Sequence, residues 1–164
     1  MGIPKSSTDH PKVIVFPPII LATTIALGSV LQWLWPIGFL ATAIQTWRIP
    51  VGVAVILAGV LLAATGRRTL VRLGTEVSPL QPTAALATDG VFGWTRNPLY
   101  SGGMLVIFGI ALVFALDLLL LLIVPSLLVL HFGVVKREEE YLEQKFGDRY
   151  RIYRSNVARY GLGI

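Results

Sequence analysis

Long apolar runs separated by short polar segments dominate the pattern of the chain. No charged residue occurs in residues 13–47. At about 1.5 Å per helical residue, this stretch exceeds one crossing of a hydrocarbon core about 30 Å thick. The chain must therefore turn, and Pro36-Ile37-Gly38 offers the break. The pattern predicts a first membrane helix over residues 18–35 and a short apolar link as far as Trp47.

A second membrane helix is predicted directly after Pro50. Its apolar part covers residues 51–66 and continues as a basic helical extension over residues 67–73, which Gly74 could end as the C′ residue. The following segment, residues 75–89, contains Pro79 and Pro82 and shows weak periodicity. It is therefore predicted to be an ordered loop.

The last apolar run predicts a helical hairpin. In residues 99–135 the only charged residue is Asp117. A single helix of that length would measure about 55 Å, which is too long for a bilayer. A carboxylate in the middle of a membrane is costly whereas one at the interface is not, so Asp117 marks the tip of the hairpin. Pro125 predicts a kink in the returning helix, and His131 lies near its end.

The polar tail has the pattern of an amphipathic helix. Apolar and aromatic residues recur at intervals of three and four, namely Leu142, Phe146, Tyr150, Tyr153 and Val157. The pattern breaks at Gly147-Asp148, where Asp148 could cap a new turn. Such a helix could lie on the lipid surface or fold over the bundle, and either placement is compatible with a role in a catalytic site.

Composition places the chain among membrane proteins. With 54% hydrophobic residues and a mean hydropathy of +0.71, the 164 residues are predicted to form one all-α domain, an integral membrane bundle of about four transmembrane helices. Without cysteine, disulfide and thiolate chemistry are excluded, and two histidines give no basis for a dedicated metal site. The excess of 14 basic over 9 acidic residues fits membrane orientation better than a nucleic-acid partner.

The basic residues also predict an orientation. Two precede the first helix, one lies in the first loop, four in the second loop, none at the hairpin tip and seven in the tail. Four crossings with both termini in the cytoplasm fit this alternation. The second loop and the tail would then lie on the same side of the membrane.

Two polar stretches on that side carry the candidate chemistry. The first, residues 88–103, contains Arg96-Asn97-Pro98, which places Asn97 at or near a helix N-cap with Tyr100 on the same helix face. The free N–H groups of such a helix start suit a carboxylate or a ribose hydroxyl. The second stretch, residues 136–140, ends in three glutamates that could hold a cationic or polyhydroxyl ligand. A capped helix start with a snorkelling arginine and a solvated helix face are the ordinary alternatives.

Taken together, these residues resemble a known family. They are Gly74-Thr75, Pro79, residues 86–92, residues 96–100, Arg137-Glu138-Glu139, Leu142, Phe146-Gly147, Tyr150, Tyr153 and Arg159. The set is similar to the isoprenylcysteine carboxyl methyltransferase group, integral-membrane enzymes related to the phospholipid N-methyltransferases. The resemblance implies a cofactor-binding core over residues 74–164, preceded by the first membrane helices and a polar segment at residues 1–12.

The resemblance further implies S-adenosylmethionine as cofactor and a lipophilic acceptor, a prenylated or lipid-like substrate methylated on a carboxyl or an amine. It assigns cofactor binding to Leu86, Ala87, Gly90, Phe92, Asn97, Pro98, Tyr100, Glu138 and Glu139, and catalytic roles to Asn97, Tyr100 and Arg137. Methyl transfer from a sulfonium requires alignment and exclusion of water, without a metal or a covalent residue. An apolar cleft between membrane helices would admit the acceptor from the bilayer.

The chain departs from this family at two positions. Asn97 stands where the family often has histidine, and Val134 stands where the prenylcysteine enzymes tend to carry an arginine for the substrate carboxylate. Arg137 or Arg96 could replace that arginine. An NADPH-dependent sterol-type reductase is an alternative, although the chain has no dinucleotide glycine fingerprint, and a non-enzymatic membrane scaffold is another. Which of Glu138 and Glu139 contacts the cofactor stays open.

Overall fold

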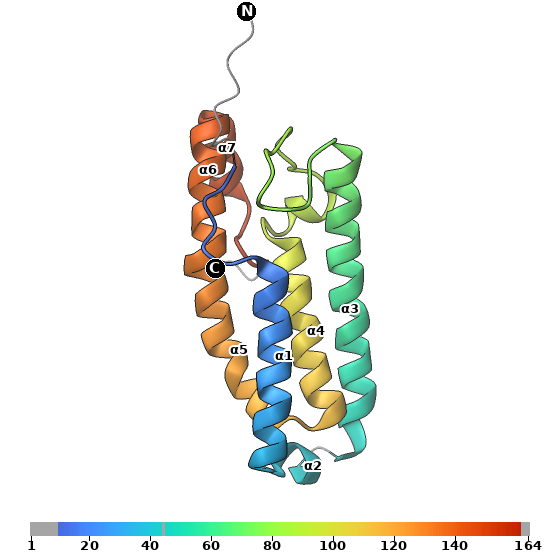
Figure 1. Ribbon diagram of the computed structural model, residues 1–164. Helices are drawn as coiled ribbons and strands as arrows, with labels where there is room; N and C mark the ends of the chain where they lie inside the picture. Colours follow the sequence, from blue (N-terminus) through green and yellow to red (C-terminus); the bar gives the residue numbers. More distant parts are fainter. Residues whose placement is uncertain (1–9, 44, 162–164) are drawn as a thin grey trace, which may run out of the picture.

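The computed structural model describes residues 10–43 and 45–161, and all regular structure in these parts is helical (Figure 1). In chain order the helices are α1 (Pro17–Leu34), α2 (Phe39–Ala43), α3 (Gln45–Arg72), the short 3-10 helix η1 (Gly90–Gly93), α4 (Pro98–Phe114), α5 (Asp117–Leu130), the π-helical turn η2 (His131–Val135), α6 (Lys136–Phe146) and α7 (Asp148–Asn156). The prediction of an all-α bundle is confirmed for the described residues.

Within the described residues, three helical stretches are long and apolar enough to cross a membrane. They are Pro17–Leu34, Thr46–Arg72 and Asp117–Phe146, the last of which joins α5, η2 and α6 into one rod. α4 is equally apolar but has 17 residues, which lies at the short end of the range for a crossing, about 17–25. The chain is thus a multi-pass membrane protein, and a fourth crossing by α4 stays a prediction.

The first membrane helix was predicted within one residue at each end. The break at Pro36-Ile37-Gly38 is also confirmed, but the link that follows contains α2. The predicted start of the second helix after Pro50 is wrong, because α3 begins at Gln45 and includes this proline. Pro50 lies in the second turn of α3, where it removes one helical hydrogen bond close to the amino-terminal end.

The carboxyl end of α3 is closed as the sequence predicted. Gly74 has a φ of +66°, its N–H donates to Val71 O at 3.0 Å, and the N–H of Thr75 donates to Leu70 O at 3.0 Å. This pair of bonds defines a Schellman motif, which requires a residue that adopts positive φ without strain. The motif turns the chain into the loop that begins at Thr75.

Glycines bring α3 and α4 into backbone contact. A Cβ added to Gly59 would lie 2.6 Å from Gly102 O, and one added to Gly109 would lie 2.6 Å from Gly52 O. Small residues at facing positions allow membrane helices to approach this closely. The spacing of these glycines fixes how α4 lies along α3, and therefore where the first turn of α4 is placed.

Polar side chains close the opposite end of the bundle. Asp117 begins α5 at the tip of the α4–α5 hairpin, as predicted, and its Oδ1 accepts the N–H of Leu40 at 3.0 Å. Arg48 donates to the carbonyls of Leu112 and Val113 at the end of α4. These contacts satisfy helix termini that would otherwise be unpaired near the membrane.

The tail folds back over the bundle. α6 continues the line of α5, and α7 lies beside it at the same end as the loop between α3 and α4 (Figure 1). The break occurs at Gly147, whose φ is +55°. Asp148 is the first residue of α7 and makes no capping bond, so the predicted cap is wrong. Tyr150 and Tyr153 are buried, which favours packing on the bundle over lying on lipid.

Candidate functional site

A cavity lies where the loop after α3, the start of α4 and α6 meet. It is lined by residues 75–79, 83, 85–87, 92 and 96–100, together with Pro11, Leu70, Glu138, Glu139, Tyr141, Leu142, Tyr150 and Tyr153. Its empty space is about 830 Å³, including the open mouth.

The two polar stretches singled out in the sequence meet at this cavity. Eight of the nine residues assigned to cofactor binding line it, namely Leu86, Ala87, Phe92, Asn97, Pro98, Tyr100, Glu138 and Glu139. Gly90 and Arg137 do not. Gly90 has a φ of +60° at the start of η1, so glycine is needed at this position for its backbone conformation.

The loop before the site is held by specific hydrogen bonds. Thr75 Oγ1 accepts the N–H of Ala85 at 3.0 Å and donates to the carbonyl of the same residue at 3.2 Å. The N–H of Thr83 donates to the hydroxyl of Tyr141 at 3.2 Å. These contacts tie the loop to the end of α3 and to α6, which confirms that the loop is ordered. The sequence offered no signal for Thr83 or Tyr141.

η1 is fixed from the other side by α7. The hydroxyl of Tyr153 donates to Phe92 O at 2.7 Å, and both side chains are buried. Burial raises the pKa of Tyr153, so its hydroxyl stays a donor over the physiological range. The aromatic ring of Phe92 is thereby held against the cavity.

Asn97 is the N-cap residue of α4, as predicted, and Pro98 is the first residue of the helix. The side chain of Asn97 is engaged within the protein, because its Nδ2 donates to Arg159 O at 3.2 Å. Thr95 Oγ1 donates to the same carbonyl at 2.9 Å, and the N–H of Arg96 donates to Ala158 O at 3.0 Å. The carboxyl-terminal segment thus runs along the start of α4.

Glu138 has one partner among the described residues. The hydroxyl of Tyr100 donates to Glu138 Oε1 at 2.6 Å, and both residues line the cavity. A hydroxyl–carboxylate bond of this length is charge-assisted and among the stronger hydrogen bonds in proteins. It joins the first turn of α4 to α6 across the site.

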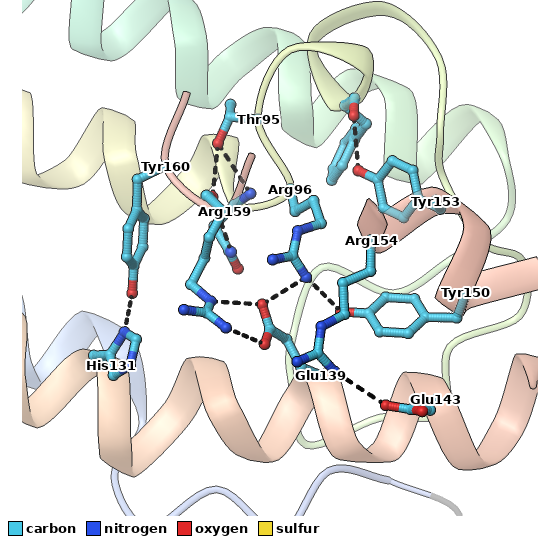
Figure 2. Close-up of polar contacts among 12 residues, drawn as sticks. Thr95, Arg96, His131, Glu139, Glu143, Tyr150, Tyr153, Arg154, Arg159 and Tyr160 are labelled. Carbon is cyan, nitrogen blue, oxygen red and sulfur yellow. Dashed lines mark hydrogen bonds and ion pairs between the residues drawn. The ribbon is translucent and has the colours of Figure 1, made fainter. Parts of the chain in front are cut away.

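Glu139 is engaged within the protein by two arginines (Figure 2). Arg159 donates from Nε to Oε1 and from Nη2 to Oε2, both at 2.8 Å, and Arg96 Nη1 lies 2.8 Å from Oε1. The side chains of Arg96 and Glu139 are each only 8% exposed. The carboxylate therefore connects three segments that are far apart in sequence.

Tyr150 completes this cluster. Its hydroxyl accepts a hydrogen bond from Arg96 Nη1 at 3.2 Å (Figure 2). Burial and then the negative charge of Glu139 raise the pKa of Tyr150 to about 12, so it is neutral at physiological pH. The hydrogen bonds to Glu139 also raise the pKa of Arg159. The cluster consequently has two positive charges and one negative charge.

Arg137 does not line the cavity and instead holds the amino-terminal segment. Its Nη1 donates to Lys12 O at 3.1 Å, and the N–H of Ile14 donates to Gly133 O in η2 at 3.0 Å. This docking brings Pro11, which no sequence pattern had marked, into the cavity wall. The placement gives no support to the catalytic role assigned to Arg137. Val134 is fully buried and also lies outside the lining.

Comparison with known proteins is consistent with this arrangement. No match is found among the curated proteins. A family model described as phospholipid methyltransferase matches residues 47–149, well over half of the 164 residues. The matched region includes α3, the ordered loop, α4 and the two glutamates of α6. The chain therefore belongs to the phospholipid methyltransferase family, whose enzymes use S-adenosylmethionine.

Proposed function

We propose that the protein transfers the methyl group of S-adenosylmethionine to a lipophilic acceptor at this cavity. The proposal rests on one observation above all. The start of α4 and the start of α6 line the same cavity, with the hydroxyl of Tyr100 donating to Glu138 at 2.6 Å. Family membership adds methyl transfer as the reaction class.

The lining fits the proposed cofactor. Leu86, Ala87 and Phe92 form an apolar part of the wall, which suits a flat nucleobase, whereas Glu138 suits a hydroxyl or a positive charge. We assign direct contacts to these residues together with Asn97, Pro98 and Tyr100. Glu139 is assigned a positioning role, because both of its oxygens already accept hydrogen bonds from arginine.

The residues of the chain orient the two ligands and take up a proton from the acceptor. When bound, the cofactor supplies a methyl carbon that its sulfonium has already activated. Glu138 can take up the proton that an acceptor nitrogen must lose, and Tyr100 fixes the orientation of this carboxylate. The closed loop around Thr75 and Ala85 limits the entry of water. No metal or covalent intermediate is required.

The charges favour an amine as the acceptor group over a carboxyl. Among the described lining residues, Arg96 is the one cationic side chain, and it is paired with Glu139. Within the described residues, Glu76 and Glu138 add carboxylates to the lining without an arginine or lysine partner. A lipid with a cationic amine headgroup matches the carboxylates of this wall.

Binding and turnover test the proposal separately. We expect isothermal titration of the detergent-purified protein to detect S-adenosylhomocysteine, and no binding up to millimolar concentration would contradict the proposed site. We expect labelled methyl to move from S-adenosylmethionine into an amine lipid of a total lipid extract. Label in an acidic prenylated thioether instead would overturn the assignment of the acceptor.

Two other functions predict different results in the same assays. A sterol-type reductase would oxidise NADPH, and the family match does not favour it. A non-enzymatic scaffold would bind S-adenosylhomocysteine yet transfer no methyl group to any fraction of the extract. Turnover with a lipid acceptor separates our proposal from both.

A further inference from the structure

The buried cluster beside the cavity carries more positive than negative charge. Arg96 and Arg159 share the single carboxylate of Glu139. Arg96 is 8% exposed, and its Nε is buried without a hydrogen-bond partner in the described part of the chain. Burying a donor of a charged group without a hydrogen-bond partner is costly. The site therefore lacks a hydrogen-bond acceptor for Arg96 Nε.

The two arginines differ in how much of the guanidinium is used. Arg159 turns its Nε and Nη2 edge to Glu139 and so saturates both carboxylate oxygens. Arg96 contributes Nη1 alone, which contacts Glu139 and the hydroxyl of Tyr150. A guanidinium has five N–H donors in a planar fork, so the Nε and Nη2 edge of Arg96 retains donor capacity.

Only one of the two arginines lines the cavity. Arg96 belongs to the wall, next to Asn97 and Pro98, whereas Arg159 is not part of it. Figure 2 shows Glu139 between the two guanidiniums, in contact with both Arg96 and Arg159. The remaining edge has the geometry that binds carboxylate or phosphate oxygens in pairs.

We propose that Arg96 forms an oxyanion-binding subsite of the cavity. The inference rests on the proposed function, because the oxyanion belongs to one of its two ligands. It is either the carboxylate of the amino-acid part of the cofactor or the phosphate of the acceptor headgroup. Both sources offer paired oxygens to the same guanidinium edge, and an experiment separates them.

The variant Arg96→Gln removes the guanidinium of the proposed subsite and leaves Glu139 with Arg159 as its remaining arginine partner. Glu139 keeps both hydrogen bonds from Arg159, and the cluster changes from a net positive charge to a neutral one. Arg96→Lys is the second variant, which keeps the charge and loses the planar fork. Arg154→Gln is the matched control, since it removes a half-exposed arginine that pairs with Glu143 at 3.2 Å.

The first arm measures cofactor binding by isothermal titration with purified full-length protein. S-adenosylhomocysteine carries the carboxylate, and 5′-methylthioadenosine lacks the whole amino-acid part. If the cofactor supplies the oxyanion, Arg96→Gln weakens binding of S-adenosylhomocysteine by about tenfold or more and leaves binding of 5′-methylthioadenosine unchanged.

The second arm measures methyl transfer to phosphatidylethanolamine and to stearylamine, an amine without phosphate. If the acceptor supplies the oxyanion, Arg96→Gln raises KM for phosphatidylethanolamine alone. Arg154→Gln changes neither arm. If wild-type protein binds S-adenosylhomocysteine and both Arg96 variants match it in both arms, the subsite is wrong. If wild-type protein binds no cofactor, the proposed function itself is wrong.

Discussion

Adjacent glutamates on α6 have different tasks because successive residues of a helix point about 100° apart. Glu138 faces the cavity and is held by Tyr100 on α4, so its carboxylate is available to a ligand. Glu139 faces the arginine cluster and joins α6 to the carboxyl-terminal segment. A sequence pattern with three consecutive glutamates marks both positions and cannot distinguish them.

The change Glu138→Gln is expected to weaken cofactor binding without unfolding the protein. It removes the negative charge beside the cavity but keeps an oxygen that accepts the hydrogen bond of Tyr100. We predict a loss of affinity for S-adenosylhomocysteine of about tenfold or more by isothermal titration. Glu140→Gln, two positions further along the same helix, is the control with unchanged affinity, since Glu140 does not line the cavity.

The change Glu139→Gln is expected to act on stability. It leaves the guanidiniums of Arg96 and Arg159 near one another without a counter-charge, and breaking a buried ion pair costs about 3–5 kcal/mol. Thermal unfolding in detergent should show a clearly lower midpoint than for Glu143→Gln, which removes a more exposed carboxylate. Equal midpoints for the two variants would contradict a structural role for Glu139.

The sequence identified side chains at the site better than it identified their partners. Asn97, Tyr100 and Glu138 were predicted because each lies in a local pattern, a helix start or a charge cluster. The contact between Glu139 and Arg159 joins positions 20 residues apart across a bend at Gly147, and no local pattern specifies it. The contact of Arg137 with Lys12 likewise joins distant segments, so no local pattern indicated that Arg137 would lie outside the cavity lining.

At the scale of elements, α3 and α4 form the frame that positions the site. Gly59 and Gly102 face each other, and Gly52 faces Gly109 seven residues along. Seven-residue spacing keeps residues on one face of neighbouring helices, so this signal was present in the sequence although the prediction did not use it. The Tyr100–Glu138 contact depends on it, because Tyr100 lies in the first turn of α4.

Adding a methyl group at this frame should separate the two helices. In Gly59→Ala the new Cβ would meet the backbone oxygen of Gly102 at 2.6 Å, a contact that no side-chain rotation relieves. We predict destabilisation of about 1–3 kcal/mol, measured as a lower thermal midpoint in detergent. Gly38→Ala is the control, because nothing lies within 4 Å of a Cβ at that position.

Element boundaries were predictable where the chain itself terminates a helix. Gly74 and Gly147 adopt positive φ just after a helix ends, and Asp117 begins the helix after a hairpin turn. Each of these residues therefore marks a helix boundary. The start of α3 and the short helix α2 were missed because apolar residues there continue without interruption. The π-helical turn η2 has no sequence signature, yet its Gly133 carbonyl binds the amino-terminal segment.

At the scale of the whole molecule, the cavity lies at one end of a membrane bundle. α6, α7 and the ordered loop gather at that end, and the α4–α5 turn and α2 lie at the other (Figure 1). Large apolar side chains such as Leu57, Leu61 and Leu121 remain exposed along the helices, as contact with lipid tails requires.

The distribution of basic residues predicts that the cavity end faces the cytoplasm. The chain has no native cysteine, so single cysteines report their own position. We expect Ser155→Cys on α7 to react with an impermeant maleimide only in inside-out vesicles, and Gly38→Cys between α1 and α2 only in right-side-out vesicles. Labelling of both from the same side would contradict the predicted crossings.

The central claim is that two segments distant in sequence form one cofactor site. The most direct test is photolabelling of the detergent-purified protein with an azido analogue of S-adenosylmethionine, followed by mass spectrometry of the peptides. The account predicts modified peptides from residues 83–100 and from residues 138–142, both lost in excess S-adenosylhomocysteine. Labelling confined to one of these segments, or unaffected by that competitor, would contradict it.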